Sequence, residues 1–370
     1  MYKIENIVNT ILFGHVLEQL KKIPNNSIDL MITSPPYYGL RKYETNPVIW
    51  DNHNGCDHEW ETFTRKGQTG GTKSLKVQIK DKINFQIVPD SIQGFCVKCG
   101  AWKGELGLEP TFKLYIQHLL EIFEEARRVL KSEGSCWVNL GDSYSSGSNQ
   151  GAGANRNGTK QGTNKGSLYL SAKGSKSLLV NTGIVKKSLM GIPDRFKIAM
   201  IDNGWICRNE IIWHKPNQMP SSAKDRFTGD YEKFYWFTKN SKYYFEQQLE
   251  KSLWADKDKR FINGPTKGNK CSQGQYAQNE SGKFRKDGMR NKRTVWSINT
   301  QGIKDPHFAT YPEELVKTPI LACCPENGIV LDIFIGSGTT GKVARDLGRN
   351  FIGIELNEDS IEIAKKRINI

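Results

Sequence analysis

The segment IVLDIFIGSGTTGKVARDLGRNFIGIE, residues 329–355, has the pattern of a buried strand, a glycine loop, a helix and a second buried strand. Apolar residues run almost without interruption up to Ile335, and Gly336, Ser337 and Gly338 then make a turn. Short apolar runs bounded by turn residues are typical of strands that are buried on both faces. The segment therefore predicts an α/β domain built on a parallel, doubly wound, Rossmann-like sheet.

The glycine loop predicts a site for a nucleotide-type cofactor. Glycines let the backbone approach a ligand, and Glu355 ends the next strand, where a carboxylate can accept hydrogen bonds from ribose hydroxyls. Glycine turns after strands are common, so the loop alone is a weak signal, which the spaced acid strengthens. The segment has no Gly-Lys-Ser/Thr sequence, and this disfavours a triphosphate as the ligand.

A second strand end near the beginning of the chain has unusual chemistry. In DLMITSPPYYGL, residues 29–40, a buried strand ends at Thr33 and is followed by a hydroxyl, two prolines and two aromatic rings. Prolines do not continue the strand pairing, so the Ser34 hydroxyl and the Pro35 carbonyl can accept hydrogen bonds from a planar amino group. Tyr37 offers a face for stacking. An ordinary Pro-Pro turn is the alternative, and a cofactor loop on the same sheet edge disfavours it.

The positive charge of the chain is concentrated in two segments. The formal net charge is +14. Residues 143–188 contain seven Lys/Arg and no Asp/Glu, and residues 251–293 contain twelve Lys/Arg and four Asp/Glu. Concentrated positive charge suits a nucleic-acid backbone, because each neutralised phosphate releases counterions. A pair of solvated lysine-rich loops is the alternative.

The chain of 370 residues is long enough to bury a large core. It contains no apolar run of the roughly 18 to 20 residues that cross a bilayer, and its first residues, MYKIENIVNT, do not resemble a secretory signal. We therefore expect a cytoplasmic protein that does not bind membranes.

Four potential metal ligands occur in two close pairs. Cys56 and His58 form one pair, and Cys96 and Cys99 form the other, in a polar stretch that cannot build its own core. Such ligands can close a tetrahedral zinc site. His53 is an alternative to His58, and unligated thiols are the alternative to zinc.

Three separated motifs together resemble a known family. TSPPY at residues 33–37, DIFIGSGTT at 332–340 and HFATYPEEL at 307–315 resemble the S-adenosylmethionine-dependent amino-methyltransferases of DNA. Their order, with the catalytic motif before the cofactor motif, is similar to that of the β class. The resemblance covers residues 10–43, 110–142, 190–240 and 305–370. One departure is His15, which stands where an acidic residue is common in the family.

The resemblance implies roles for particular residues. The catalytic loop would be Ser34, Pro35, Pro36 and Tyr37, and the cofactor S-adenosyl-L-methionine would contact Asp332, Phe334, Gly336, Ser337, Gly338, Thr339, Glu355, Phe308 and Thr310. It also suggests that Trp213, His214 and Lys215 lie at the rim of the active site. Asp142 ends another strand and either faces the site or caps a neighbouring element.

The expected function is site-specific methylation of the exocyclic amine of a flipped base in double-stranded DNA. Ser before Pro-Pro-Tyr favours N4 of cytosine in this family, and N6 of adenine is the alternative. A zinc-containing DNA-binding protein without catalysis and an RNA or protein methyltransferase are further alternatives. A second copy of the chain and a restriction endonuclease are additional partners that the resemblance allows.

The expected catalytic domain is interrupted by three other segments. Its parts are residues 1–43, 111–142, 189–244 and 301–370, and they alternate with a zinc module at 44–110, a mobile basic loop at 143–188 and a target-recognition segment at 245–300.

Overall fold

The computed structural model of the protein describes residues 1–39, 47–51, 55–61, 63–65, 91–145, 184–185, 187–251, 289–301 and 310–370. Most of the expected basic loop at 143–188 lies outside these residues, as do 252–288 of the expected recognition segment and Phe308. No helix in the described part of the chain is long and apolar enough to cross a membrane.

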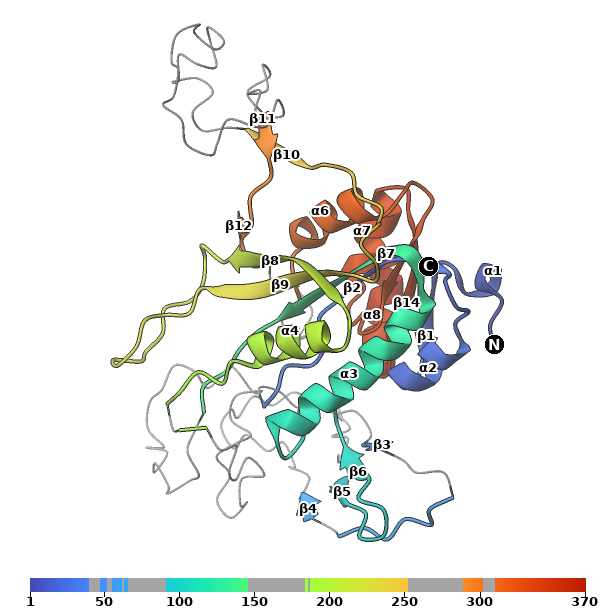
Figure 1. Cartoon of the computed structure of the whole chain (residues 1–370), viewed down its shortest axis with the longest axis vertical. Coiled ribbons are helices and arrows are strands. Elements are labelled where there is room, and N and C mark those ends of the chain that lie inside the picture. The colour runs from blue at the N-terminus through green and yellow to red at the C-terminus, as the bar shows by residue number, and fades with distance from the viewer. Residues whose placement is uncertain are drawn as a thin grey trace, which may run out of the picture.

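An eight-stranded sheet forms the centre of the molecule (Figure 1). Its strand order is β1 (Thr10–Phe13), β14 (Asn350–Glu355), β13 (Ile329–Asp332), β2 (Ile28–Thr33), β7 (Leu130–Leu140), β9 (Tyr231–Thr238), β8 (Ile206–His214) and β12 (Val295–Ser297). The first five of these strands are parallel to one another. Their carboxyl ends therefore lie at one edge of the sheet.

The sheet is mixed, whereas the sequence predicted a parallel one. Strand β9 pairs antiparallel with both β7 and β8. Residues 215–230, which connect β8 to β9, contain no helix. A parallel pair needs a long crossover, usually helical, so two successive strands without one pair antiparallel.

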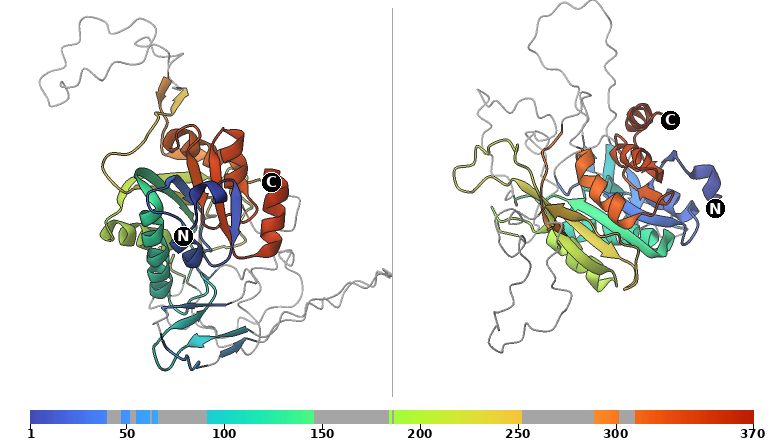
Figure 2. Two further views of the ribbon diagram at one scale, coloured as in Figure 1. Left: turned by 90° about the vertical axis from the view of Figure 1, so that its right-hand side faces the viewer. Right: turned by 90° about the horizontal axis from the view of Figure 1, so that it is seen from above.

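Helices cover both faces of the sheet (Figure 2). One core lies under α2 (Val16–Lys22), α3 (Phe112–Val129) and α4 (Ile192–Asp202), and the other lies under α6 (Glu313–Cys323), α7 (Thr339–Asp346) and α8 (Glu358–Ile368). A short helix, α1 (Ile4–Ile7), precedes β1. In β2, Met31 packs in the first core while Leu30 and Ile32 pack in the second, as the alternation of side chains along a strand requires.

Two smaller sheets lie at opposite ends of the molecule (Figures 1 and 2). One has the order β3 (Val48–Trp50), β6 (Trp102–Gly104), β5 (Ser91–Phe95) and β4 (Phe63–Arg65), and the other pairs β10 (Leu249–Lys251) with β11 (Met289–Asn291). In the four-stranded sheet Ile49 and Phe95 are 38% and 36% exposed, and Val97, two residues after β5, is 61% exposed. This sheet therefore has little core of its own.

Candidate active site

The turns after β2 and β13 lie side by side at the carboxyl edge of the central sheet. The two strands are parallel, with Leu30 opposite Val330. At the edge, the Thr33 hydroxyl donates a hydrogen bond of 2.8 Å to Asp332 Oδ1, and both side chains are buried. The structure thus brings together the Ser34–Tyr37 loop and the glycine loop, which are some 300 residues apart in sequence.

Asp332 connects several elements of the site. Besides the bond from Thr33, its carboxylate accepts hydrogen bonds from the Thr340 hydroxyl at 2.5 Å, the Tyr311 hydroxyl at 2.8 Å and the Phe334 N–H at 3.1 Å. Burial raises the pKa of Asp332, and the hydroxyl donors oppose this rise because they stabilise the carboxylate. The side chain therefore ties β13 to β2, to α7 and to the segment before α6.

The glycine loop has two positions with left-handed backbone. Gly336 and Gly338 have φ values of +50° and +85°, which favour glycine. A Cβ added at Gly336 would meet only the Phe334 carbonyl oxygen, at 3.9 Å, whereas one at Gly338 would lie 2.9 Å from Ile368 Cδ1. The backbone at Gly336 therefore borders open space, while Gly338 packs closely against α8.

The side chains of Ser337 and Thr339 form hydrogen bonds with α8 and do not point away from the protein core. The Arg367 guanidinium, from α8, donates to Ser337 Oγ at 2.7 Å, to the Ser337 carbonyl at 2.8 Å and to Thr339 Oγ1 at 3.2 Å. Both residues are buried. These hydrogen bonds hold the loop in shape and tie it to α8.

The other expected cofactor residues lie near the same loop where they are described. Phe334 is half-buried and packs against the core under α2 and α3. Thr310 is half-buried and precedes Tyr311, whose hydroxyl reaches Asp332. Phe308 lies outside the described residues.

Glu355, at the end of β14, holds the loop from the other side. Its Oε2 accepts a hydrogen bond from the Gly336 N–H, and its Oε1 accepts from the N–H groups of Leu356 and Asn357, each at 2.9 Å. Burial raises the pKa of Glu355, and these amides oppose the rise. Since a carboxylate has about four acceptor positions, one on Oε2 remains for a further donor.

The Tyr37 ring is fixed at its hydroxyl end. Its oxygen lies 2.9 Å from Asn139 Oδ1, 2.8 Å from Glu232 Oε2 and 3.5 Å from the Ser34 hydroxyl. The Lys215 ammonium forms an ion pair with the other oxygen of Glu232. Polar groups from β7 and β9 therefore orient the ring beside Ser34, which is half-buried.

Contacts from the α3 side fix the backbone of the same loop. The Tyr115 hydroxyl donates a hydrogen bond of 2.7 Å to the Pro36 carbonyl, and the Gly39 N–H donates one of 2.8 Å to the Gly107 carbonyl. Pro35 is buried. Neither contact uses the Ser34 hydroxyl or the Pro35 carbonyl, the two acceptors expected for an amino group.

Asp142 caps a neighbouring helix. Its carboxylate accepts hydrogen bonds from the N–H groups of Ser143, Gly191 and Ile192 at 2.8, 2.9 and 3.1 Å, at the start of α4. Of the two alternatives for this residue, the structure favours the cap.

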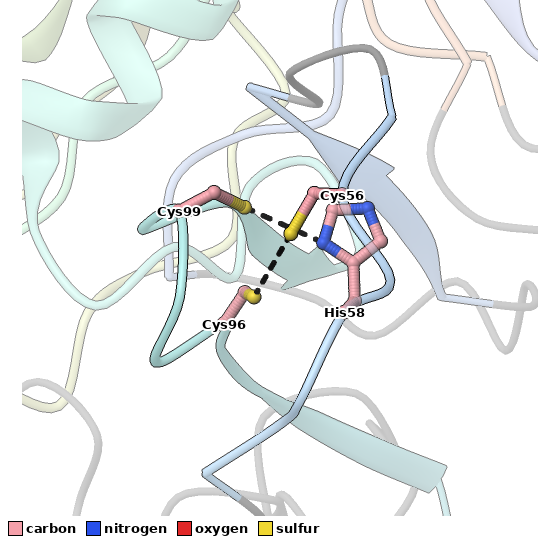
Figure 3. A group of neighbouring side chains, drawn as sticks. All are labelled: Cys56, His58, Cys96 and Cys99. Carbon is pink, nitrogen blue, oxygen red and sulfur yellow. Dashed lines mark hydrogen bonds between the residues drawn. The ribbon is translucent and has the colours of Figure 1, made fainter.

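The four expected metal ligands lie together (Figure 3). Cys56 Sγ is 3.9 Å from Cys96 Sγ, Cys99 Sγ is 3.4 Å from His58 Nδ1, and all four ligand atoms lie within 4.8 Å of one another. In a tetrahedral zinc site the edge between two sulfurs is about 3.8 Å and that between sulfur and nitrogen about 3.6 Å. The cluster has the donor set and nearly the spacing that such a site needs.

Several residues at the site were not singled out from the sequence. Asn139 and Glu232 lie within strands, where periodicity indicates burial but not hydrogen-bond partners. Arg367 lies in a charged helical face, whose usual interpretation is a solvated surface. Tyr311 did have a signal, because it lies inside the HFATYPEEL motif.

Comparisons with known proteins agree with this geometry. Residues 28–366 match the N6/N4 methyltransferase family, described as DNA methylase. The Type II methyltransferase M.Cfr9I of Citrobacter freundii is 30% identical, over 97% of this chain and 87% of the relative. The Type II methyltransferase M.SmaI of Serratia marcescens is also 30% identical, over 97% of this chain and 90% of the relative. Among solved structures, PvuII DNA methyltransferase (cytosine-N4-specific) has a TM-score of 0.52 at 16% identity, over 96% of this chain and 85% of that one, which shows a shared fold.

Proposed function

This chain belongs to the N6/N4 DNA methylase family, which confirms the resemblance seen in its motifs, and we propose that it methylates N4 of cytosine in double-stranded DNA with S-adenosyl-L-methionine as methyl donor. The hydrogen bond between Thr33 and Asp332 is the observation that carries the proposal. Thr33 directly precedes the Ser34–Tyr37 loop, and Asp332 begins the segment expected to hold the cofactor. Their hydrogen bond therefore places the two loops next to each other. A methyl donor and an acceptor amine can therefore be held at the same sheet edge.

The glycine loop fits the proposed cofactor. Gly336 presents backbone to open space that a Cβ would enter, and Glu355 keeps one acceptor position for a ribose hydroxyl. When bound, the cofactor supplies an electrophilic methyl group on sulfur. Asp332 and Arg367 contribute by holding the loop, since their hydrogen bonds end on the loop and its neighbours.

Ser34 and Pro35 have the chemistry to activate an amine. The lone pair of an exocyclic amine is delocalised into the base, so hydrogen bonds from its N–H groups to the Ser34 hydroxyl and the Pro35 carbonyl favour a tetrahedral, nucleophilic nitrogen. Positioning of this nitrogen in line with the methyl group then supplies much of the rate. This mechanism requires no covalent bond between the enzyme and the base.

The target base must leave the duplex before it can react, because its amine is used in base pairing. Flipping costs a few kcal/mol, and stacking on the Tyr37 ring offsets about 1–3 kcal/mol of that cost. The Tyr37 hydroxyl donates its one hydrogen bond to Asn139 Oδ1 or to Glu232 Oε2, which lie 2.9 and 2.8 Å away. This bond fixes the ring in advance, so little of the stacking energy is lost in ordering it.

The choice of cytosine N4 is supported by Ser34, the residue before Pro-Pro-Tyr, through the family resemblance. The net charge of +14 and the Type II methyltransferase relatives support double-stranded DNA as the substrate and a restriction endonuclease as the functional counterpart.

A structural zinc ion is the second part of the proposal. Cys56, His58, Cys96 and Cys99 would hold it and close the end of the four-stranded sheet, whose apolar side chains are partly exposed. Elemental analysis of the purified protein should give one zinc per chain, and a Cys96→Ser/Cys99→Ser double variant should contain none. A metal-free wild-type protein with the same fold would contradict this assignment.

Nucleoside mass spectrometry of duplex DNA incubated with the protein and S-adenosyl-L-methionine tests the proposed reaction. We expect N4-methylcytosine; N6-methyladenine would overturn the choice of base, and no modified nucleoside would overturn the activity. Ser34→Ala should lower kcat by about 10²-fold, a loss typical of removing one hydrogen bond to a reacting group. Ser132→Ala, at the exposed start of β7, is the matched control and should keep full activity.

A further inference from the structure

His118 is enclosed where α3 meets the four-stranded sheet. Its side chain is fully buried, between the Trp50 ring at 4.6 Å and the Trp102 ring at 5.5 Å, each inclined by 21° to the imidazole. Trp50 lies on β3 and Trp102 on β6, so two strands of the small sheet pack against a side chain of α3. His15, the residue that departs from the family pattern, also packs edge-to-face with Trp50, with 4.8 Å between the ring centroids.

Two carboxylates contact the two ring nitrogens of His118. Nδ1 is 3.0 Å from Glu109 Oε1 and Nε2 is 3.1 Å from Asp51 Oδ2. A neutral imidazole donates only one hydrogen bond, so two carboxylate partners require a proton on both nitrogens or on one of the acids. Burial of His118 opposes its charge, but Glu109 and Asp51 outweigh that effect and raise the pKa of the imidazole. The three side chains therefore form one charged array.

The array continues to the catalytic loop. Glu109 Oε2 accepts a hydrogen bond of 2.8 Å from the Gly107 N–H, and the Gly107 carbonyl accepts the one from the Gly39 N–H, also 2.8 Å. A Cβ on Gly107 would lie 3.1 Å from the Tyr37 carbonyl oxygen, so the two backbones are in close contact. Tyr115, one turn before His118 on α3, holds the Pro36 carbonyl. The loop is thus held on both sides of Tyr37.

We propose that the Asp51–His118–Glu109 array positions the Ser34–Tyr37 loop and couples it to the zinc-bearing sheet. The inference rests on the proposed function and adds positioning residues to it. These residues act through Gly107 and the loop backbone and do not contact the reacting atoms. A buried ionic array is seldom more stabilising than apolar side chains of the same volume, so stability alone gives little reason for three charged groups here. Correct placement of the Ser34–Tyr37 loop gives a better reason for them, since an error of about 1 Å at a reacting group can cost about 10²-fold in rate.

Substitution of Glu109 in the full-length, zinc-loaded protein tests this inference. Glu109→Ala removes the acceptor of the Gly107 N–H, and we expect kcat for methyl transfer to fall by roughly 10- to 100-fold. The Kd for S-adenosyl-L-methionine should change by less than about 2-fold, because the cofactor loop is held by other residues. Glu109→Gln keeps an acceptor for Gly107 and should recover most of kcat.

Two further variants make the test independent of folding defects. Tyr115→Phe deletes only the hydroxyl that holds Pro36, and it should lower kcat several-fold with cofactor Kd and zinc content unchanged. Glu124→Ala removes an exposed carboxylate on the same helix, which accepts a hydrogen bond from Asn203, and it should behave as wild type.

The outcomes separate this inference from the function on which it rests. No methyl transfer by the wild-type protein would overturn the proposed function. An active wild type together with full kcat in Glu109→Ala would overturn only the inference. So would an unchanged kcat with a raised KM for cofactor or DNA, because that pattern indicates a role in binding.

Discussion

The glycine loop, which we propose binds the cofactor, and the four-stranded sheet are held in place in different ways. The loop follows β13 and precedes β14, two inner strands of the central sheet, and Asp332 and Glu355 bind it with hydrogen bonds from several directions. The four-stranded sheet has short strands and partly exposed apolar side chains, and beside it lie the buried ring of His118 and the four proposed zinc ligands, whose sulfur and nitrogen atoms are within 4.8 Å of one another. Burial and hydrogen bonds organise the first region, whereas the second has less buried apolar surface and would gain most from the bonds of the proposed zinc ion.

This contrast predicts that metal removal disorders the four-stranded sheet but leaves the glycine loop intact. Its effect on activity should be larger than that of a single substitution in either region. Structural zinc contributes about 10–16 kcal/mol in small zinc-dependent folds, far more than the few exposed apolar contacts of this sheet. A chelator should therefore disorder the sheet and lower methyl transfer by at least about 10-fold, while the cofactor Kd changes little. Tryptophan fluorescence reports on the sheet through Trp50, Trp60 and Trp102, and added zinc should restore both signals. Full activity of the zinc-free protein would show that the sheet does not support the site.

Asp332 provides the corresponding test of the cofactor region. Asp332→Ala leaves the buried hydroxyls of Thr33 and Thr340 without their acceptor, so the free energy of unfolding should fall by about 3 kcal/mol. Urea denaturation measures this loss. Asp346→Ala, an exposed aspartate of α7 paired with Lys342, is the control and should change stability by less than about 0.5 kcal/mol. Equal effects of the two substitutions would mean that the Asp332 network does not stabilise the loop.

The smallest expected effect is a dependence of stability on pH at the junction of the two regions. His118 faces Glu109 and Asp51, with Glu121 and His15 nearby, and its folded-state pKa lies above the ordinary value of 6.5. Its stabilising contribution is complete below pH 6.5 and is lost as the pH rises through the folded-state pKa. Burial also raises the pKa of Glu109, which gives the same sign.

Urea unfolding of the wild type and of His118→Gln, followed from pH 6 to pH 9, measures this dependence. The stability advantage of the wild type should decrease with pH, by at most about 1.4 kcal/mol per pH unit for one proton. A constant difference, or one that grows with pH, would show that His118 is not held in its charged form.

Local patterns predicted the main elements well. The strand expected to end at Thr33 does so, as Ile28–Thr33, and the strand, helix and second strand expected within residues 329–355 are Ile329–Asp332, Thr339–Asp346 and Asn350–Glu355. Turn residues and apolar periodicity are properties of short segments, so they fix where these elements begin and end. The antiparallel placement of β9 was not predicted, because it depends on which strands pair and not on the sequence of any one strand.

The sequence by itself determined the chemistry that is available: a glycine loop with a following acid, a Ser-Pro-Pro-Tyr loop, four potential metal ligands and an excess of positive charge. It also determined the family, because three motifs occur in one order. Only the tertiary structure decided which side chains meet, such as Thr33 with Asp332, Tyr37 with Glu232, and His118 with Glu109 and Asp51. Contacts of this kind join residues from different elements, and their geometry is set by sheet register and helix packing, which no local pattern encodes.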